Sequence, residues 1–257
     1  MSVTSDEQKN EGGIGEIISI VLQALALAIV VQLFFFQPFN IPSGSMEHTL
    51  RVGDYLFVSK FSYGYSRYSF TSHFLGVDRG VIPFSGRIFG SDPKPGDIVV
   101  FRKPTDDAVD FIKRVVGLPG DKIQMKQGIL HINGVAVKRE YEKDFDEIDY
   151  TGHRVTGKQY LETLANGVSY HVLKQTDEGP YNNTQVYEVP PGHYFMMGDN
   201  RDNSADSRFL NEVGFVPADN LIGRARIIFF SHAGDTPVWQ FWNWPWTLRF
   251  TRFMTLL

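Results

Sequence analysis

Cysteine is absent from this chain of 257 residues. The absence excludes disulfide bonds, thiolate nucleophiles and cysteine-ligated metal sites together. It does not fix the redox compartment, because proteins of many compartments have no cysteine. The search for a reactive side chain therefore begins with serine and with the bases that can activate it.

A concentrated basic segment is also missing. The 25 Lys and Arg residues are scattered along the chain and are outnumbered by 29 Asp and Glu, which gives a formal net charge of -4. Nucleic-acid-binding proteins usually carry a basic patch, so we expect no nucleic-acid partner. A hydrophobic content of 42% is that of a folded protein with a packed core, not of a disordered chain.

One hydrophobic run of the sequence is long enough to cross a bilayer. Residues 17–36 are uncharged, and their only polar side chains are Ser19, Gln23 and Gln32. About 20 apolar residues match the thickness of the hydrocarbon core. A cleavable signal peptide would have a shorter apolar region and a small-residue cleavage site, and a buried globular helix is seldom apolar on all sides. We therefore predict an uncleaved transmembrane helix.

The predicted span divides the chain into a short head, residues 1–16, and a large domain, residues 37–257. The head contains Lys9 against four acidic residues, so the positive-inside rule does not orient the helix. All of the strand-like patterning follows the span. We therefore expect a single-pass protein with a cytoplasmic N-terminus and a translocated large domain.

The large domain is expected to be mostly β. Short segments rich in Val, Ile, Phe and Tyr alternate with Gly, Pro and Asp clusters, which is typical of an all-β domain. The expected strands are residues 55–61, 98–101, 111–116, 129–137, 186–189, 193–197 and 221–230. Residues 63–95 form a long excursion, and residues 139–183 a polar, acid-leaning insertion without a chemical motif.

All four tryptophans lie between Trp239 and Trp246. Tryptophan is favoured where one side is apolar and the other is wet, as in a membrane interface. Packing of this tail on the β core is the other interpretation, and the sequence does not separate the two.

Ser45 is the candidate nucleophile. It lies in the turn-like sequence Ser43-Gly44-Ser45, nine residues after Phe36. Nine residues extend at most about 30 Å, so Ser45 must lie close to the membrane surface. The seven histidines follow no recognisable triad order, and neither Gly-x-Ser-x-Gly nor His-Glu-x-x-His occurs. Triads on unrelated folds share no common spacing, however, so the sequence does not exclude histidine as the base.

Lys113 is the other candidate base. Alternation along the expected strand 111–116 puts Lys113 on the face of Phe111 and Val115 and puts Arg114 on the opposite face. One of these two cations must then lie among apolar side chains. Burial that lowers the lysine pKa from about 10.4 to about 8 costs roughly 3 to 4 kcal/mol, which desolvation can supply. A strand lysine whose head group reaches water is the alternative.

The loop at residues 198–208, Gly-Asp-Asn-Arg-Asp-Asn-Ser-Ala-Asp-Ser-Arg, is rich in Asp and Asn. A calcium loop started at Asp199 has Arg201 at its third position, and one started at Asp202 has Val213 at its twelfth. We therefore expect no calcium site. A tight polar loop that orients a base accounts better for this composition.

Four ordered blocks of the sequence resemble the bacterial type I signal peptidases, membrane-bound serine endopeptidases with a Ser/Lys dyad. They are IPSGSMEHTL with GDYLFVSKFSYG at residues 41–64, FIKRVVGLPGDKI at 111–123, GDNRDNSADSR at 198–208 and GFVPADNLIGRA at 214–225. With the span, they cover nearly all of the chain outside the excursion and the insertion. Long blocks in a fixed order are far more specific than a single short motif.

The resemblance implies a role for each matching residue. Ser45 would be the nucleophile, Lys113 the general base and Ser43 a donor in the oxyanion hole. Ser204 would hydrogen-bond to the lysine and orient it, and Asp206 and Arg208 would hold the loop in shape. Pockets for small residues, usually Ala, one and three positions before the cut would be bordered by Ile41, Met46, Leu50, Phe111 and Ile112.

The resemblance also implies location and partners. It places the protein in the bacterial inner membrane with its catalytic domain on the periplasmic, extracytoplasmic side. The substrates would be secreted and membrane preproteins with an Ala-x-Ala site, and the partners would be the lipid bilayer and the protein export machinery. No metal or cofactor is implied.

The sequence departs from the family pattern at two places, and two other functions are compatible with parts of it. His48 stands where the family very often has proline, and residues 139–183 have no clear counterpart. A self-cleaving Ser/Lys regulator of the kind found on DNA-binding repressors is disfavoured by the span and by the missing basic region. A non-enzymatic β domain for envelope assembly is disfavoured because both Ser45 and Lys113 are present.

Overall fold

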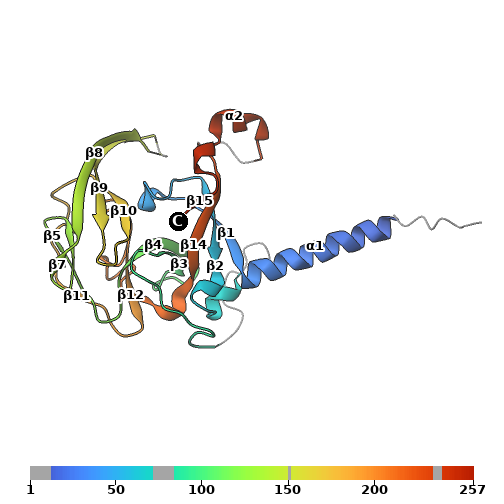
Figure 1. Ribbon diagram of the computed structural model, residues 1–257, viewed down its shortest axis with the longest axis horizontal. Helices are drawn as coiled ribbons and strands as arrows, with labels where there is room; N and C mark the ends of the chain where they lie inside the picture. The colour runs from blue at the N-terminus through green and yellow to red at the C-terminus, as the bar shows by residue number, and fades with distance from the viewer. Residues whose placement is uncertain (1–12, 72–83, 150–151, 234–238) are drawn as a thin grey trace, which may run out of the picture.

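The computed structural model describes residues 13–71, 84–149, 152–233 and 239–257. Parts of the predicted head and of the excursion at residues 63–95 lie outside these ranges. The described chain opens with the helix α1 (Ile14–Phe34), which has no buried residue and projects from the rest of the protein (Figure 1). By its length and composition it is apolar enough to cross a membrane.

The helix differs slightly from the predicted span of residues 17–36. It begins at Ile14 and ends at Phe34, and Phe36 already pairs with Ser59 in the first strand. Proline disfavours helical backbone at the residue before it, so Pro38 helps to stop the helix inside the apolar run. The chain therefore passes from α1 directly into the main sheet.

The main sheet is antiparallel and has the strand order β1-β2-β14-β3-β4-β12-β13, with β15 paired to β14. Its strands are β1 (Phe36–Asn40), β2 (Asp54–Ser59), β3 (Ile98–Arg102), β4 (Asp110–Gly117), β12 (His193–Met197), β13 (Val216–Pro217), β14 (Leu221–Ser231) and β15 (Thr255–Leu256). The strand β3 is flanked by β14 and β4, whereas β4 is paired with β3 along residues 110–114 and with β12 only at Arg114, Val115 and Gly117.

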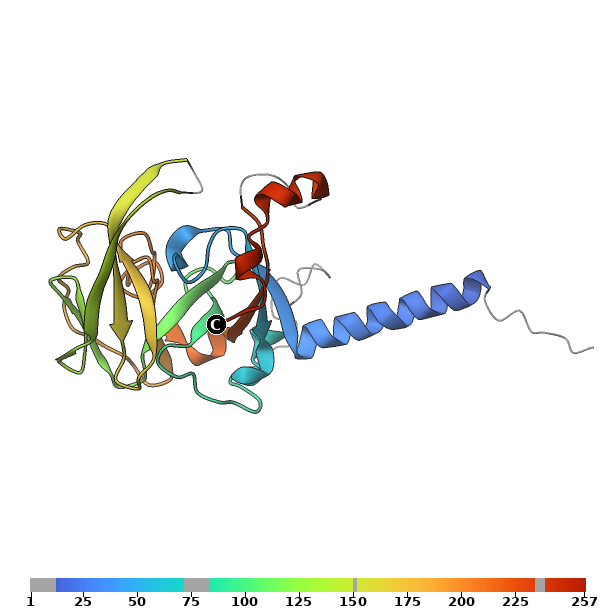
Figure 2. The same cartoon turned by 45° about the horizontal axis from the view of Figure 1, so that its top comes forward.

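Two smaller antiparallel sheets lie at the end of the molecule away from α1 (Figures 1 and 2). One has the order β10-β9-β8, formed by β8 (Lys138–Ile148), β9 (Arg154–Thr163) and β10 (Ser169–Lys174). The other has the order β11-β5-β6-β7, formed by β5 (Lys122–Lys126), β6 (Ile129–Ile132), β7 (Val135–Ala136) and β11 (Tyr187–Glu188).

These sheets confirm the mostly β fold and correct two details. The expected strand 129–137 is two strands, because Asn133 and Gly134 form a turn with φ values of 54° and 81°. Such turns are typical of Asn-Gly. The polar insertion at residues 139–183 contains most of the sheet β8–β10. The charged, largely exposed side chains of β8 hide the apolar alternation that identifies a strand.

The core lies on both faces of the main sheet. Ile98 and Val100 of β3 contribute to one buried cluster together with Met46, whereas Val99 and Phe101 contribute to another. Alternating burial of this kind follows from the two-residue period of a strand. Met46, the neighbour of Ser45, is thus anchored in the core.

The tryptophan-rich tail is mostly exposed. It contains the short helix α2 (Trp244–Thr247), and Trp239, Trp242 and Trp246 are exposed. Trp244 packs edge-on against Phe230 of β14, with ring centroids 5.8 Å apart. The tail therefore touches the β core through Trp244 and presents its other three tryptophans to the surroundings.

Candidate active site

Ser45 lies in a single 3-10 turn, η1 (Gly44–Met46), directly after the extended segment that follows β1. Asn200 of the polar loop holds this turn at two points. Its main-chain N–H donates to the Ser45 carbonyl oxygen at 3.1 Å, and its Nδ2 donates to the Gly44 carbonyl oxygen at 3.0 Å. With Met46 fixed in the core, the Ser45 side chain has a defined position.

The structure brings Lys113 of β4 to Ser45, 68 residues away in sequence. Lys113 Nζ lies 2.7 Å from Ser45 Oγ and 3.0 Å from the Ile112 carbonyl oxygen. The two residues are 4% and 8% exposed. Burial lowers the pKa of Lys113 to about 8, although the negative charges of Asp206 and Asp199 oppose this shift. The lysine is therefore substantially neutral slightly above neutral pH.

A lowered pKa alone does not identify the base. Lys60 is also buried, and desolvation lowers its pKa to about 7, but its Nζ donates to the Thr71 carbonyl oxygen at 3.1 Å. No histidine in the described part of the chain forms a hydrogen bond with Ser45. Contact with the serine hydroxyl therefore distinguishes Lys113 from the other candidates.

Ser43 lies beside the pair, with its Oγ 3.4 Å from Ser45 Oγ. Ser43, Ser45 and Lys113 line one cleft of about 370 Å³. Phe111 and Ile112, which the resemblance implies as borders of the substrate pocket, line the same cleft. The cleft is completed by Pro42, Gly44, Val109, Asp110, Asn203 and Ala205.

Three residues predicted to border the substrate pocket do not line this cleft. Ile41, Met46 and Leu50 are almost fully buried in the apolar cluster that also includes Leu56 and Val58. The family resemblance implied contact with substrate, but in this structure the side chains of all three residues are directed into the core. They belong to the core next to the turn that carries Ser45. Val109, Asn203 and Ala205 line the cleft instead.

Arg114, next to Lys113, is the second buried cation of β4. It points away from Lys113 as strand alternation predicted and forms hydrogen bonds with both carboxylate oxygens of Asp199 at 2.8 and 2.6 Å. Its guanidinium also stacks 4.1 Å from the ring centre of Tyr170. Arg114 therefore remains charged and paired, whereas Lys113 has no carboxylate partner within ion-pair distance among the described residues.

Asp206 and Arg208 form a buried ion pair inside the polar loop. Asp206 accepts hydrogen bonds from Arg208 Nε at 2.8 Å and from the Gly198 N–H at 3.0 Å. Burial raises the pKa of Asp206, but the charge and hydrogen bonds of Arg208 outweigh it and the pKa is lowered. Arg208 also donates to the Arg201 carbonyl oxygen at 2.6 Å, so the pair closes the loop on itself.

Ser204 is buried beside this ion pair but does not meet the expectation of a hydrogen bond to Lys113. Its hydroxyl lies close enough to Asp206 to lower the pKa of that carboxylate, yet Ser204 Oγ makes no hydrogen bond of good geometry with a described residue. A side chain on Gly198 would collide with both Ser204 Oγ and the Ser45 carbonyl oxygen. Gly198 thus allows the loop to approach the turn closely.

Three residues that shape the site have no signal in the sequence: Asn200, Gly198 and Glu162. Asn200 and Gly198 belong to the polar loop that was singled out, but their roles depend on its distance from Ser45 and no local pattern shows this. Glu162 of β9 lies in the insertion and pairs with Arg201 through both carboxylate oxygens. Among the described residues, no group of three His, Asp or Glu side chains is arranged to hold a metal ion.

The sequence pattern of the signal peptidase family, peptidase S26, matches residues 14–230 of this chain. Signal peptidase I of Rickettsia typhi is 42% identical over 217 residues, which cover 80% of this chain and 76% of the relative. Signal peptidase I of Rickettsia prowazekii is 41% identical over 216 residues with the same coverage. A signal peptidase I of Enterococcus faecalis with a solved structure is 26% identical, covers 52% of this chain and 97% of its own, and superposes with a TM-score of 0.31. With a match of this length and identity, the chain belongs to the signal peptidase I enzymes of the S26 family of serine peptidases, which cleave signal peptides.

Proposed function

We propose that the protein cleaves preproteins through an acyl-enzyme on Ser45, with Lys113 as general base. The neutral Lys113 amine takes the proton of Ser45 Oγ while the oxygen attacks the carbonyl carbon before the cut. The carbon–nitrogen bond of the tetrahedral intermediate then breaks, and the Lys113 ammonium gives its proton to the leaving amine. Lys113 then takes a proton from water as the water oxygen attacks the ester carbon, and the Lys113 ammonium returns that proton to Ser45 Oγ when the ester bond breaks and the signal peptide leaves.

The observation that carries this proposal is the 2.7 Å distance between Lys113 Nζ and Ser45 Oγ. It lies within the range required for direct proton transfer. The pKa of Lys113 near 8 leaves a useful fraction of neutral amine at physiological pH. Burial supports the same role, because exclusion of water keeps the amine poorly solvated.

Ser43 is proposed as a hydroxyl donor to the oxyanion. Ser43 lines the same cleft as the nucleophile, and its Oγ lies 3.4 Å from Ser45 Oγ. One donor of this kind stabilises a transition state by about 2.7 to 4 kcal/mol in measured cases. Asp206, Arg208 and Ser204 are proposed to support the polar loop that packs against the pair.

The substrate segment before the cut is proposed to bind as an extended strand along β4. Residues 110–113 pair with β3 on one edge, whereas β12 pairs only with Arg114, Val115 and Gly117 on the other. Within the described residues, the half of β4 that carries Lys113 therefore has an open edge, which can accept a peptide strand. The apolar Phe111 and Ile112 beside it suit the small residues of an Ala-x-Ala site.

The location is proposed as a single-pass inner-membrane protein with a cytoplasmic head and a periplasmic domain. The exposed apolar helix α1 supports membrane insertion, and exposed Trp242 and Trp246 suit a membrane interface. In intact spheroplasts, externally added protease should digest the domain after α1. Full protection of that domain would contradict this orientation.

The mechanism is tested by cleavage of a preprotein with an Ala-x-Ala site in detergent. Wild type, Ser45→Ala, Lys113→Ala and the control Ser91→Ala are compared, and the new N-terminus is identified by mass. Ser91 is exposed and does not line the cleft, so its replacement should leave cleavage intact. Cleavage that survives undiminished in Ser45→Ala would refute the proposal.

A further inference from the structure

A second cleft, of about 730 Å³, separates the main sheet from the sheet β8–β10. It begins at His48 and Thr49, which follow Ser45 by three and four residues. Its far wall includes Lys143 and Gln159 of the insertion, and its near wall includes the segment around Asp97. We call it the insertion cleft, because the insertion forms one whole side of it.

The insertion cleft has an excess of positive charge. Two acidic side chains, Asp97 and Glu147, line it together with six cations, Arg51, Lys94, Arg114, Lys143, Arg224 and Arg252.

Three of these cations are neutralised by carboxylates. Arg114 pairs with Asp199, Arg224 with Asp97 and Arg252 with Asp54. The other three cations, Arg51, Lys94 and Lys143, form no ion pair with any residue that the structure describes. Of the two acidic side chains, Asp97 is paired with Arg224, whereas Glu147 forms no ion pair with a described residue. Three unpaired cations therefore face one unpaired acid, which favours an anionic ligand.

The walls also carry polar atoms that lack partners. Gln159 is 6% exposed, and its Nε2 donates to Glu142 at 2.8 Å, but its Oε1 has no hydrogen-bond partner among the described residues. The same is true of His48 Nε2, Arg51 Nε and Arg224 Nε. Because buried polar atoms without partners are costly, a polar ligand that reaches these atoms with both donors and acceptors would be favoured. A polypeptide main chain offers both.

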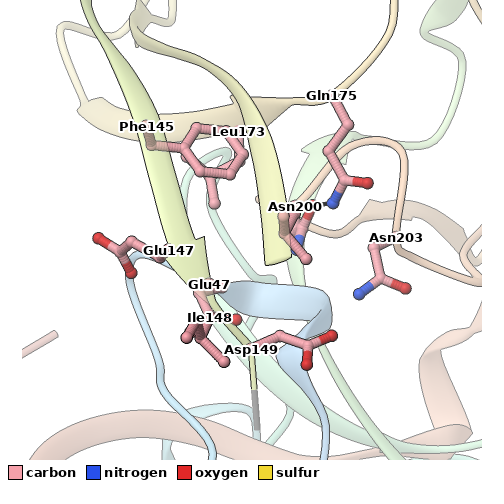
Figure 3. A pocket seen from close by; sticks show the side chains of 10 residues that line it. Glu47, Phe145, Glu147, Ile148, Asp149, Leu173, Gln175, Asn200 and Asn203 are labelled. Carbon is pink, nitrogen blue, oxygen red and sulfur yellow. Dashed lines mark hydrogen bonds between the residues drawn. The ribbon is translucent and has the colours of Figure 1, made fainter. Parts of the chain in front are cut away.

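A small hollow lies between the insertion cleft and the cleft at Ser45 and shares a lining residue with each; Figure 3 shows the side chains that line it. It shares Asn203 with the Ser45 cleft and Glu147 with the insertion cleft. Figure 3 shows Glu47, Glu147 and Asp149 around this hollow, so its lining is acidic. Because three extended residues span at most about 11 Å, the backbone of His48, which lines the insertion cleft, lies within about 11 Å of the backbone of Ser45.

The direction of the substrate follows from the position of α1, if the proposed function holds. The membrane-inserted part of a preprotein precedes the cut. In the enzyme, Pro42 and Ser43 of the Ser45 cleft follow directly after β1, which itself follows α1. The sheet β8–β10 lies at the opposite end of the molecule (Figures 1 and 2). We therefore place the segment after the cut on the side of Ser45 that faces the sheet β8–β10, where it passes the small hollow before it reaches the insertion cleft.

We infer that the insertion cleft binds the first residues of the mature protein, from about the third residue after the cut onward, and that it favours acidic side chains there. The inference rests on the proposed function and assigns a role to the insertion. The acidic hollow, in contrast, gives no advantage to an acidic side chain at the first position after the cut.

The inference is tested with preproteins that differ only in two residues, the third and fourth after the cut, which are Glu, Gln or Lys. We expect kcat/KM to decrease in this order, by about two- to fivefold per step at low ionic strength, because pairs at partly exposed lysines are weak. Added salt should reduce the difference. A further substrate carries Glu at the first position instead and should show no gain over Gln.

Charge reversal assigns the effect to the cleft. Lys143→Glu should abolish or reverse the preference for Glu over Lys substrates, whereas Lys138→Glu, an exposed lysine of the same strand that does not line the cleft, should retain it. Thermal unfolding confirms that both variants are folded. Equal kcat/KM for all three substrates, or an undiminished preference in Lys143→Glu, would overturn the inference. Failure of this inference can be distinguished from failure of the proposed function. If the proposed function were wrong, Ser45→Ala would cleave all of the substrates like wild type.

Discussion

Glu162 of the insertion and Arg201 of the polar loop form a buried bidentate ion pair, with 2.8 Å between Glu162 Oε1 and Arg201 Nη1. Glu162 also accepts a hydrogen bond from Tyr170, whose ring stacks on Arg114. Through these contacts the sheet β8–β10 is tied both to the polar loop and to β4, the strand that carries Lys113. The insertion is therefore part of the scaffold of the site.

Replacement of Glu162 by Gln should destabilise the domain. The substitution leaves the Arg201 guanidinium buried without its counter-ion, and breaking one partner of a buried pair typically costs about 3 to 5 kcal/mol. Thermal unfolding in detergent measures the effect. Glu140→Gln on the exposed surface of β8 is the control and should shift the midpoint little. Equal midpoints for Glu162→Gln and wild type would show that the pair does not support the fold.

Asn200→Ala should impair catalysis more than folding. The change removes the hydrogen bond from Asn200 Nδ2 to the Gly44 carbonyl oxygen but leaves the main-chain bond to Ser45. The turn then holds Ser45 less firmly, and we expect kcat to fall about tenfold with little change in KM. Steady-state kinetics check this, with Asn183→Ala in an exposed loop as control. A rise in KM with unchanged kcat would assign Asn200 to substrate binding instead.

Gly198→Ala should reduce activity through a steric effect. Gly198 has no positive φ value, so its backbone accepts alanine, but the added methyl group meets Ser204 Oγ and the Ser45 carbonyl oxygen. The loop must move away from the turn, and displacement of a reacting group by about 1 Å can cost about 100-fold in rate. Gly90→Ala, where a methyl group makes only an ordinary van der Waals contact, is the matched control. Wild-type kcat in Gly198→Ala would show that this close approach is not required.

Lys113→Met should stabilise the protein while it abolishes cleavage. The pKa of Lys113 is about 8 in the folded protein against 10.5 for a solvated lysine, so the unfolded chain binds more protons between these pH values. The free energy of unfolding therefore rises with pH from about 8 to 10.5, by about 3 kcal/mol in total, and the variant lacks this rise. Below pH 8 the variant should consequently unfold at a higher temperature than wild type.

The exposed Lys138→Met provides the control for that comparison, because Lys138 lies on the surface of β8. Its pH dependence of unfolding should follow that of wild type. If Lys113→Met also followed wild type between pH 8 and 10.5, Lys113 would not be the buried, easily deprotonated amine described above.

Sequence patterns predicted the parts of the fold and site that depend on local order. Alternation in residues 111–116 correctly separated Lys113 from Arg114, and the apolar run before Pro38 correctly predicted an isolated helix. The pairing of Lys113 with Ser45 came from the family resemblance, because a contact across 68 residues leaves no local signal.

Other features escaped prediction for physical reasons. The burial of Met46 and Leu50 depends on how the turn packs over the main sheet, and an apolar side chain looks the same in a pocket wall and in a core. The strand β8 was missed because its charged side chains are exposed on both faces for most of its length. The buried role of Glu162 was missed because its partner, Arg201, lies in another segment.

The pH dependence of kcat/KM for a preprotein substrate tests the central claim most directly. With Lys113 as base, kcat/KM should rise tenfold per pH unit below an apparent pKa of about 8 and level off above it, because only the neutral amine accepts the serine proton. Wild type is measured between about pH 6 and 10 under conditions in which the fold is intact. A profile that is already flat from about pH 7, as expected for a histidine base with its ordinary pKa of about 6.5, would contradict the account.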